Sequence, residues 1–282
     1  MFSEKYGYKG EKPLLLEDIS KTLRIRIWNL FCQNEIQAGG LNSPRIQLAL
    51  TGGVTIEDKI ADKLGFLAGS SIKKGSSKDK IEQYLILTCQ WYEVYDFIEL
   101  HLSCLPEDKR AERAKQYNEL LEYEHSGYRV VSGEIAPITN SAEIESIENA
   151  ANTPYFSVNQ HIQKALEKYA DIASPDFENS IKESISAVEA MCSIITGQSG
   201  TNATLGKTIK KLKDHGVHIH TALENAFSSL YGYTSDECGI RHGGIDFTSA
   251  PAEDAKYMLI SCSAFVNYLV EKWSKVCKDM AP

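Results

Sequence analysis

Residues 174–197 read SPDFENSIKESISAVEAMCSIITG, and this stretch has the clearest helical pattern in the second half of the chain. Ser174, Pro175 and Asp176 supply a cap, a first-turn proline and an N-terminal negative charge, which together favour the start of a helix. Gly197 is the residue type that commonly ends one. Between them, one apolar face recurs at three- and four-residue steps and consists of Ile181, Ile185, Val188, Met191 and Ile195. The pattern predicts a helix that ends near Thr196.

Apolar periodicity on either side of this stretch predicts further helices. The ranges are 158–170, 204–213, 221–231 and 253–277. No strand pattern follows residue 154. We therefore expect the second half to be a bundle of five helices.

The first half is also predicted to be mainly helical, with one small hairpin. Helical periodicity covers the ranges 18–37, 45–50, 56–66, 81–102 and 107–124. β-Branched residues on both sides of a Ser-Gly turn predict a hairpin near 128–138. Asn140 and Glu143 have the spacing of a capping box for a short helix, which Pro154 ends. The expected fold is mainly α, with two helical domains at residues 1–152 and 155–282.

Composition excludes several classes of protein. The chain has 282 residues, of which 43% are hydrophobic and 24% charged, as in an ordinary globular protein. No run approaches the roughly 18 uninterrupted apolar residues of a membrane span, and the first residues lack the pattern of a secretion signal. Seven scattered cysteines form neither a disulfide framework nor a zinc ribbon. We expect a cytoplasmic protein without a membrane partner.

The charge balance confines any contact with nucleic acid to a local patch. The chain has a net charge of −8, so the molecule as a whole repels polyanions. The densest basic run of the second half lies at 207–213, where Lys207, Lys210 and Lys211 are the candidate RNA-binding residues. The alternative is that this run is a plain solvated face.

Two other motifs of the second half have a structural interpretation. Gly200 to Thr208 resembles a phosphate-binding P-loop, but five residues separate its two glycines where the motif has four, and no strand precedes it. His215, His218 and His220 are close enough to suggest a metal site, but no further ligand set lies nearby. We therefore expect no cofactor and no metal ion.

The stretch 231–244 reads YGYTSDECGIRHGG and places charged side chains between glycines. Arg241 can hold a phosphate through two hydrogen bonds, and His242 can move a proton near neutral pH. These two groups suffice for metal-independent RNA cleavage, with Asp236 or Glu237 orienting one of them. A structural interpretation stays open, because Thr234 and Glu237 are spaced as a capping box and Arg241 can pair with either carboxylate.

Several longer stretches resemble a known bacterial family. In the second half they are 181–190, 204–207, 230–237, 239–242 and 262–269, which resemble the C-terminal module of AbiJ-type abortive-infection proteins. That module is similar to the HEPN superfamily of helical nucleotide-binding and ribonuclease domains. The opening FSEKYGY at 2–8 and the hairpin region 127–139 look like the associated AbiJ N-terminal domain.

The resemblance implies a phage-defence protein whose HEPN-like bundle dimerises and, when active, cuts RNA. A phage-derived trigger or an antitoxin is the partner that such a system implies. The chain departs from the family in one respect: Arg241 and His242 are adjacent, where catalytic HEPN domains separate the two by several residues. Neighbouring helical side chains diverge by about 100°, so both reach one phosphate only from a distorted turn or from two subunits. A non-catalytic sensing or scaffolding module is the alternative function.

Overall fold

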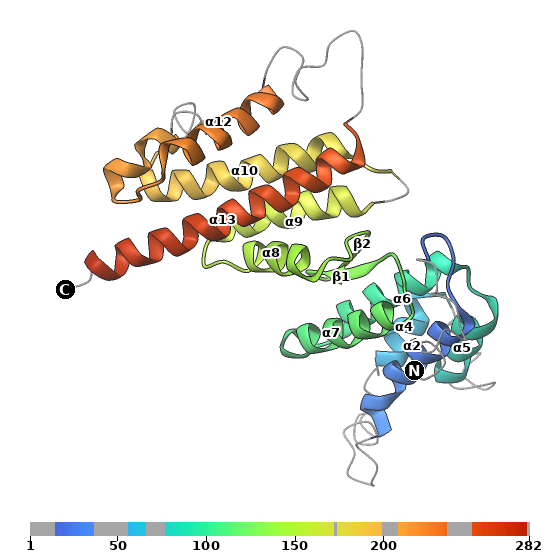
Figure 1. The fold of residues 1–282 in the computed structure, drawn as a ribbon. Helices are drawn as coiled ribbons and strands as arrows, with labels where there is room; N and C mark the ends of the chain where they lie inside the picture. The colour runs from blue at the N-terminus through green and yellow to red at the C-terminus, as the bar shows by residue number, and fades with distance from the viewer. Residues whose placement is uncertain are drawn as a thin grey trace, which may run out of the picture. The chain divides into compact units, whose positions relative to one another are not determined.

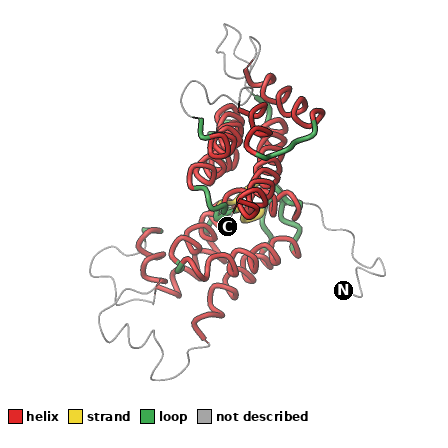
Figure 2. The backbone as a smooth tube through the Cα atoms, turned by 90° about the vertical axis from the view of Figure 1, so that its left-hand side faces the viewer, coloured by secondary structure: helices red, strands yellow, loops and turns green. Residues whose placement is uncertain are grey.

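The computed structural model describes residues 15–36, 56–65, 77–171, 174–198, 208–235 and 250–280. Their regular secondary structure is helical apart from one two-stranded sheet and an isolated bridge between Leu15 and Ser126, so the predicted mainly α fold is confirmed (Figures 1 and 2). The chain divides into two compact units, Met1–Thr139 and Asn140–Pro282. The predicted short helix over 45–50 lies outside the described residues.

Six helical segments and the hairpin make up the described part of the first unit. The segments are α2 (Lys21–Ile36), α4 (Ile56–Lys63), α5 (Ser77–Gln83), the π-helix η2 (Tyr84–Thr88), α6 (Trp91–Cys104) and α7 (Glu107–Tyr123). Their apolar faces meet in one core, in which Leu23, Ile27, Phe97 and Tyr117 are almost completely buried. Burial of such faces is the main stabilising contribution to a helical domain.

The single long helix predicted over 81–102 is wrong, because the chain breaks at Cys89 and Gln90. The guanidinium of Arg24 donates hydrogen bonds to the carbonyl oxygens of Leu85 and Cys89, each at 2.9 Å, and so satisfies carbonyl groups at the end of η2. Gln90 and Glu93 then form a capping box that begins α6. The apolar spacing continues through this break, which is why periodicity alone did not reveal it.

The predicted hairpin is present. β1 (Arg129–Val131) and β2 (Glu134–Ala136) pair antiparallel, with Val130 opposite Ile135. Both turn residues have positive φ, 49° at Ser132 and 97° at Gly133, as the favoured two-residue hairpin turn requires. The Glu99 carboxylate on α6 accepts a hydrogen bond from the Ile135 backbone N–H at 2.6 Å, which holds the hairpin against the helices of the first unit.

The second unit is a helical bundle. It contains α8 (Ser141–Ala151), α9 (Phe156–Ala170), α10 (Phe177–Thr196), the 3-10 helix η4 (Ile209–His215), α12 (Thr221–Ser235) and α13 (Ala252–Met280). In Figure 1, α9 and α10 lie beside the long α13, and α12 lies above α10. Among the described residues after 154 no strand occurs, as predicted.

The long helix α10 begins two residues later than the sequence suggested. Asp176, rather than Ser174, is its cap, and the Asp176 carboxylate accepts a hydrogen bond from the Asn179 backbone N–H at 3.2 Å. Gly197, the residue that follows the helix, adopts a left-handed conformation with φ of 64°, so the predicted end is confirmed.

The short helix α8 packs within the second unit. Asn140 caps it, accepting hydrogen bonds from the backbone N–H groups of Ala142 and Glu143. Glu143 pairs with Lys256 of α13 at 2.9 Å. The compact units thus divide just ahead of α8, whereas the domain junction expected from the sequence follows this helix.

Candidate nucleic-acid interface

The four candidate catalytic residues, Asp236, Glu237, Arg241 and His242, lie outside the described residues. The described chain ends at Ser235, the last residue of α12, and resumes at Ala250, which is buried ahead of α13. Lys207 and most of the P-loop-like stretch also lie outside the described ranges. Among the candidates, the structure therefore places only Lys210 and Lys211.

Lys210 and Lys211 project from η4, the segment predicted as an ordinary helix and found as a 3-10 helix. A 3-10 helix has three residues per turn, so residues three apart lie on the same face. Ile209 and Leu212, exposed by only 2% and 1%, share the face that packs into the bundle. Lys210 and Lys213 consequently share a second, exposed face.

The turn after η4 brings this basic helix against α13. Gly216 ends η4 in a left-handed conformation with φ of 83°, and its N–H bonds to the carbonyl groups of Leu212 and Lys213. A Cβ atom at Gly216 would come within 3.2 Å of Val276 Cγ1. The end of η4 therefore lies beside the last turns of α13, as the ribbon also shows (Figure 1).

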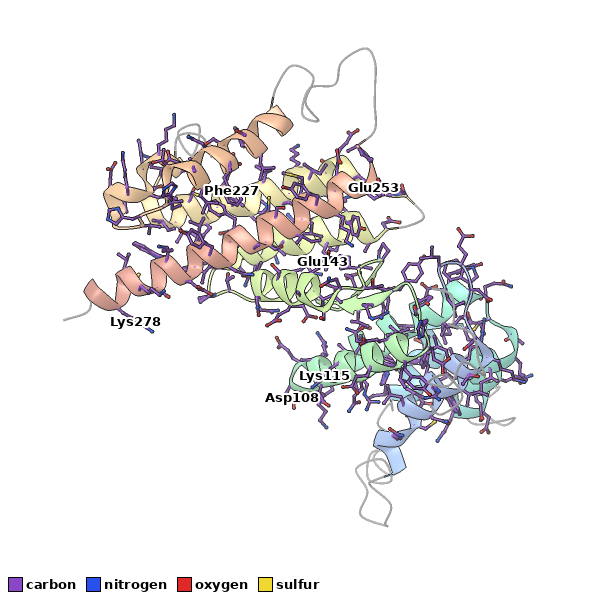
Figure 3. All side chains as sticks on the ribbon, in the orientation of Figure 1. Asp108, Lys115, Glu143, Phe227, Glu253 and Lys278 are labelled. Carbon is purple, nitrogen blue, oxygen red and sulfur yellow. The ribbon has the colours of Figure 1, made fainter. Side chains whose placement is uncertain are left out.

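The last turns of α13 add three more lysines. The Lys272 ammonium lies 5.5 Å from the centre of the Tyr268 ring, and Lys275 and Lys278 are exposed (Figure 3 labels Lys278). We call the six lysines of η4 and of the last turns of α13 the basic end. They are Lys210, Lys211, Lys213, Lys272, Lys275 and Lys278.

The basic end stands out against an acidic background. The sequence of the second unit, 140–282, contains 12 basic and 18 acidic residues, and half of the basic ones belong to the basic end. Only Asp214, Glu271 and Asp279 are acidic within the two segments 208–217 and 271–280. Because phosphate contacts by lysine release counterions from nucleic acid, such a local excess is what binding requires on a chain with net negative charge.

The three histidines, His215 at the end of η4 and His218 and His220 in the loop that follows, are exposed. The backbone N–H of Ala222 donates to His220 Nδ1 at 3.2 Å, so this imidazole serves the start of α12. Within the described ranges, no group of three or more His, Cys, Asp and Glu side chains is arranged to hold a metal ion.

The opposite end of the bundle carries a polar cluster where α13 begins. Burial, followed by the nearby charges of Glu143 and Glu253, raises the pKa of Tyr169 to about 12. Its hydroxyl therefore keeps its proton at physiological pH and can donate a hydrogen bond but cannot act as a base. The 15 residues of α12 span about 22 Å at the rise of an α-helix, so Ser235 lies about that far from the first residue of α12, which follows the loop after η4.

A pair of a histidine and a glutamate, which the sequence did not suggest, joins α9 and α10. His161 Nδ1 lies 2.6 Å from a carboxylate oxygen of Glu183, and about a third of the imidazole is exposed. The carboxylate fixes the orientation of the ring, as in many proton-transferring pairs. The two residues are 22 positions apart on different helices, so no local spacing rule could have linked them.

Comparison with known proteins identifies a family for the first half of the chain. A family model described as AbiJ N-terminal domain 4 matches residues 1–153, which is more than half of the sequence. This match takes in the first compact unit and α8. No curated protein and no solved structure matches the chain. None of the helices in the described ranges is long and apolar enough to cross a membrane.

Proposed function

Because the chain belongs to the family of AbiJ N-terminal domain 4, and thus to the abortive-infection proteins of phage defence, we propose that it is a metal-independent ribonuclease. In this proposal the second unit is a HEPN-like bundle that dimerises and cuts RNA in the cytoplasm. The observation that carries it is the stretch 236–242 between α12 and α13, which supplies two carboxylates, an arginine and a histidine.

The proposed reaction is attack of a ribose 2′-oxygen on the neighbouring phosphorus. The new bond to phosphorus forms as the bond to the 5′-oxygen breaks, so the products are a 2′,3′-cyclic phosphate and a 5′-hydroxyl. His242 moves the proton, taking it from the 2′-hydroxyl or giving it to the leaving 5′-oxygen. Arg241 binds the phosphate oxygens and stabilises their charge, and Asp236 or Glu237 orients one of the two side chains.

The remaining parts of the proposal concern binding. Lys207, Lys210 and Lys211 contact RNA phosphates, and the exposure of the last two on η4 supports this role. Dimerisation through the bundle lets Arg241 of one subunit and His242 of the other approach a single phosphate. The two side chains then need not point in the same direction from one subunit. A phage-derived trigger or an antitoxin controls the activity.

The test in cells is growth arrest on induced expression. We expect the parent protein to stop growth and the variants Arg241→Ala and His242→Ala to be harmless at the same protein level. If both variants are as toxic as the parent, the assignment of the two residues is wrong.

A second function is favoured by the adjacency of Arg241 and His242. In a non-catalytic sensing or scaffolding module, Arg241 and His242 bind a phosphate or stabilise the bundle. Thermal unfolding separates the two functions: a loss of several degrees in both variants indicates a structural role, and an unchanged Tm with lost toxicity indicates chemistry.

A further inference from the structure

One solvent-facing side of α13 carries no charge over four helical turns. Residues 257–270 read YMLISCSAFVNYLV, without a lysine, arginine, aspartate or glutamate. Half of these side chains are buried in the bundle, but Tyr257 is 57% exposed, Ala264 is exposed, and Ser261 and Tyr268 are half-buried. At 3.6 residues per turn, these four lie on one side of the helix. Helix faces in water normally carry charges, whereas the centres of protein interfaces contain few charges and many tyrosines.

Charges of opposite sign lie at the two ends of this face. Glu253 is in the first turn of α13 and Lys275 near its end, and both are exposed (Figure 3 labels Glu253 and, beyond Lys275, Lys278). Ala264 lies eleven residues from each of them, which is about three helical turns, so the three side chains are in line. The face is therefore acidic, then uncharged, then basic. An identical helix that runs in the opposite direction presents the complementary order.

The uncharged surface continues from α13 onto α12. The Phe227 ring stacks on the Phe265 ring of α13, with 3.4 Å between the ring centres. The only charged residue of α12 is Glu224, and none of its described side chains, 221–232, is fully buried. The bundle thus covers the apolar side chains of α12 only in part. They add area to the α13 face, which is needed because a stable dimer buries about 800 Å² on each copy.

We propose that the α13 helices of two copies pair antiparallel across this face, with the twofold axis at Ala264 and Glu253 of each copy bound to Lys275 of the other. This inference rests on the dimer of the proposed function and names the surface that forms it. In such a symmetric pair every contact occurs twice. The small side chains of Ser261 and Ala264 permit close approach at the centre, and the Tyr257 hydroxyl faces Glu271 of the second copy, to which it can donate a hydrogen bond.

Charge argues for a second copy as the occupant of this face. The molecule has a net charge of −8, so two copies repel each other except where a surface is uncharged or self-complementary. Glu253 and Glu271 on the exposed side would repel the phosphates of a nucleic acid. Glu253 and Lys275 each lie about 16 Å from Ala264 along the axis, and helices that cross at about 20° stay within reach of such long side chains over this length.

The pairing is compatible with the proposed catalytic arrangement. α13 begins at Ala252, so the starts of the two helices lie about 36 Å apart in the antiparallel pair. Nine residues separate Arg241 from Ala250, and a chain of that length can span up to about 30 Å. Residues of both copies can therefore reach one phosphate. The lysines of η4 take no part in the pairing.

The test is the dissociation constant of the full-chain dimer, measured by analytical ultracentrifugation at low salt, where charge effects are screened least. Glu253→Lys and Lys275→Glu should each weaken the dimer by about tenfold or more, because two attractive pairs become two repulsive ones. An equimolar mixture of the two variants should recover the affinity of the parent, because the heterodimer pairs opposite charges at both ends. Misfolding of either variant cannot produce this recovery.

Matched controls separate this face from general charge. Lys164→Glu and Glu167→Lys reverse the same charges at exposed positions of α9 and should dimerise like the parent. Ala264→Cys brings two thiols together at the twofold axis, so mild oxidation should link the two copies by a disulfide. Lys164→Cys is the control for this reaction and should not be linked. Both cysteine variants carry Cys277→Ser, which removes an exposed native thiol.

Three results would overturn the inference. They are a monomeric parent, a dimer that neither charge reversal weakens more than the α9 controls do, and a mixture of the two variants that does not recover. If any of these is found while Arg241→Ala and His242→Ala still abolish toxicity, the ribonuclease proposal stands without this interface. If the charge reversals behave as expected but both of those variants stay toxic, the interface stands and the catalytic assignment fails.

Discussion

The backbone at Gly216 lies directly against Val276, with 3.2 Å between the position of a Cβ atom at residue 216 and Val276 Cγ1. This contact joins η4 to the last turns of α13, which are 60 residues further along the chain. It is therefore the contact that gathers the six lysines of the basic end.

Gly216→Ala should destabilise the second unit for two reasons. A side chain at positive φ costs about 1 kcal/mol, and the tight approach to Val276 should raise the loss of unfolding free energy to about 2 kcal/mol. Gly197→Ala is the matched control, because Gly197 also has positive φ but no atom lies within 4 Å of its Cβ position. Urea unfolding of both variants measures the difference. Equal losses would show that the contact with Val276 contributes nothing.

Tyr117→Phe should destabilise the first unit by about 1–3 kcal/mol, because it leaves a buried acceptor without its donor. The Tyr117 hydroxyl lies 2.6 Å from His101 Nδ1, and both side chains are buried. Burial, with a smaller contribution from Arg113, lowers the pKa of His101 to about 3, so the ring is neutral and can accept this proton. Denaturant unfolding measures the loss. Tyr92→Phe, at a half-exposed position, is the control and should be neutral; a neutral Tyr117→Phe would contradict this account of the core.

Glu99→Gln should change how stability depends on pH. Burial, with a smaller effect from nearby Glu134 and Asp96, raises the pKa of Glu99 to about 7 from its ordinary 4.5. The folded state thus binds the proton more tightly than the unfolded chain, so stability is full below pH 4.5 and falls as the pH rises to about 7. Glutamine keeps an acceptor for the Ile135 N–H and carries no charge.

Thermal unfolding at pH 5 and pH 8 measures this effect. We expect Glu99→Gln to unfold at the same temperature as the parent at pH 5 and a few degrees higher at pH 8. Exposed Glu119 supplies the control, since its replacement by glutamine should shift Tm equally at both values. A Tm difference for Glu99→Gln that does not change with pH would refute the assignment.

Much of the fold followed from local patterns. The apolar stripe of α10 and Gly197 predicted one helix and its end because both signals act over a few residues. The break between η2 and α6 was missed because the apolar spacing runs through it, while its causes are a distant arginine, Arg24, and a glutamine cap at Gln90. Long-range contacts of this kind leave no local pattern in the sequence.

The basic end was only half predictable. Lys210 and Lys211 were found from the density of lysine at 207–213. The α13 lysines were missed, because only the contact of Gly216 with Val276 brings the last turns of α13 to η4. His161 and Glu183 were missed for the same reason, since they meet across two helices.

The most direct measurement is mass spectrometry of the ends left on single-stranded RNA by the purified protein in excess EDTA. We predict 2′,3′-cyclic or 3′-phosphate ends from the parent and no products from Arg241→Ala or His242→Ala. Products with 3′-hydroxyl ends, a requirement for a divalent metal ion, or undiminished cleavage by both variants would contradict the account.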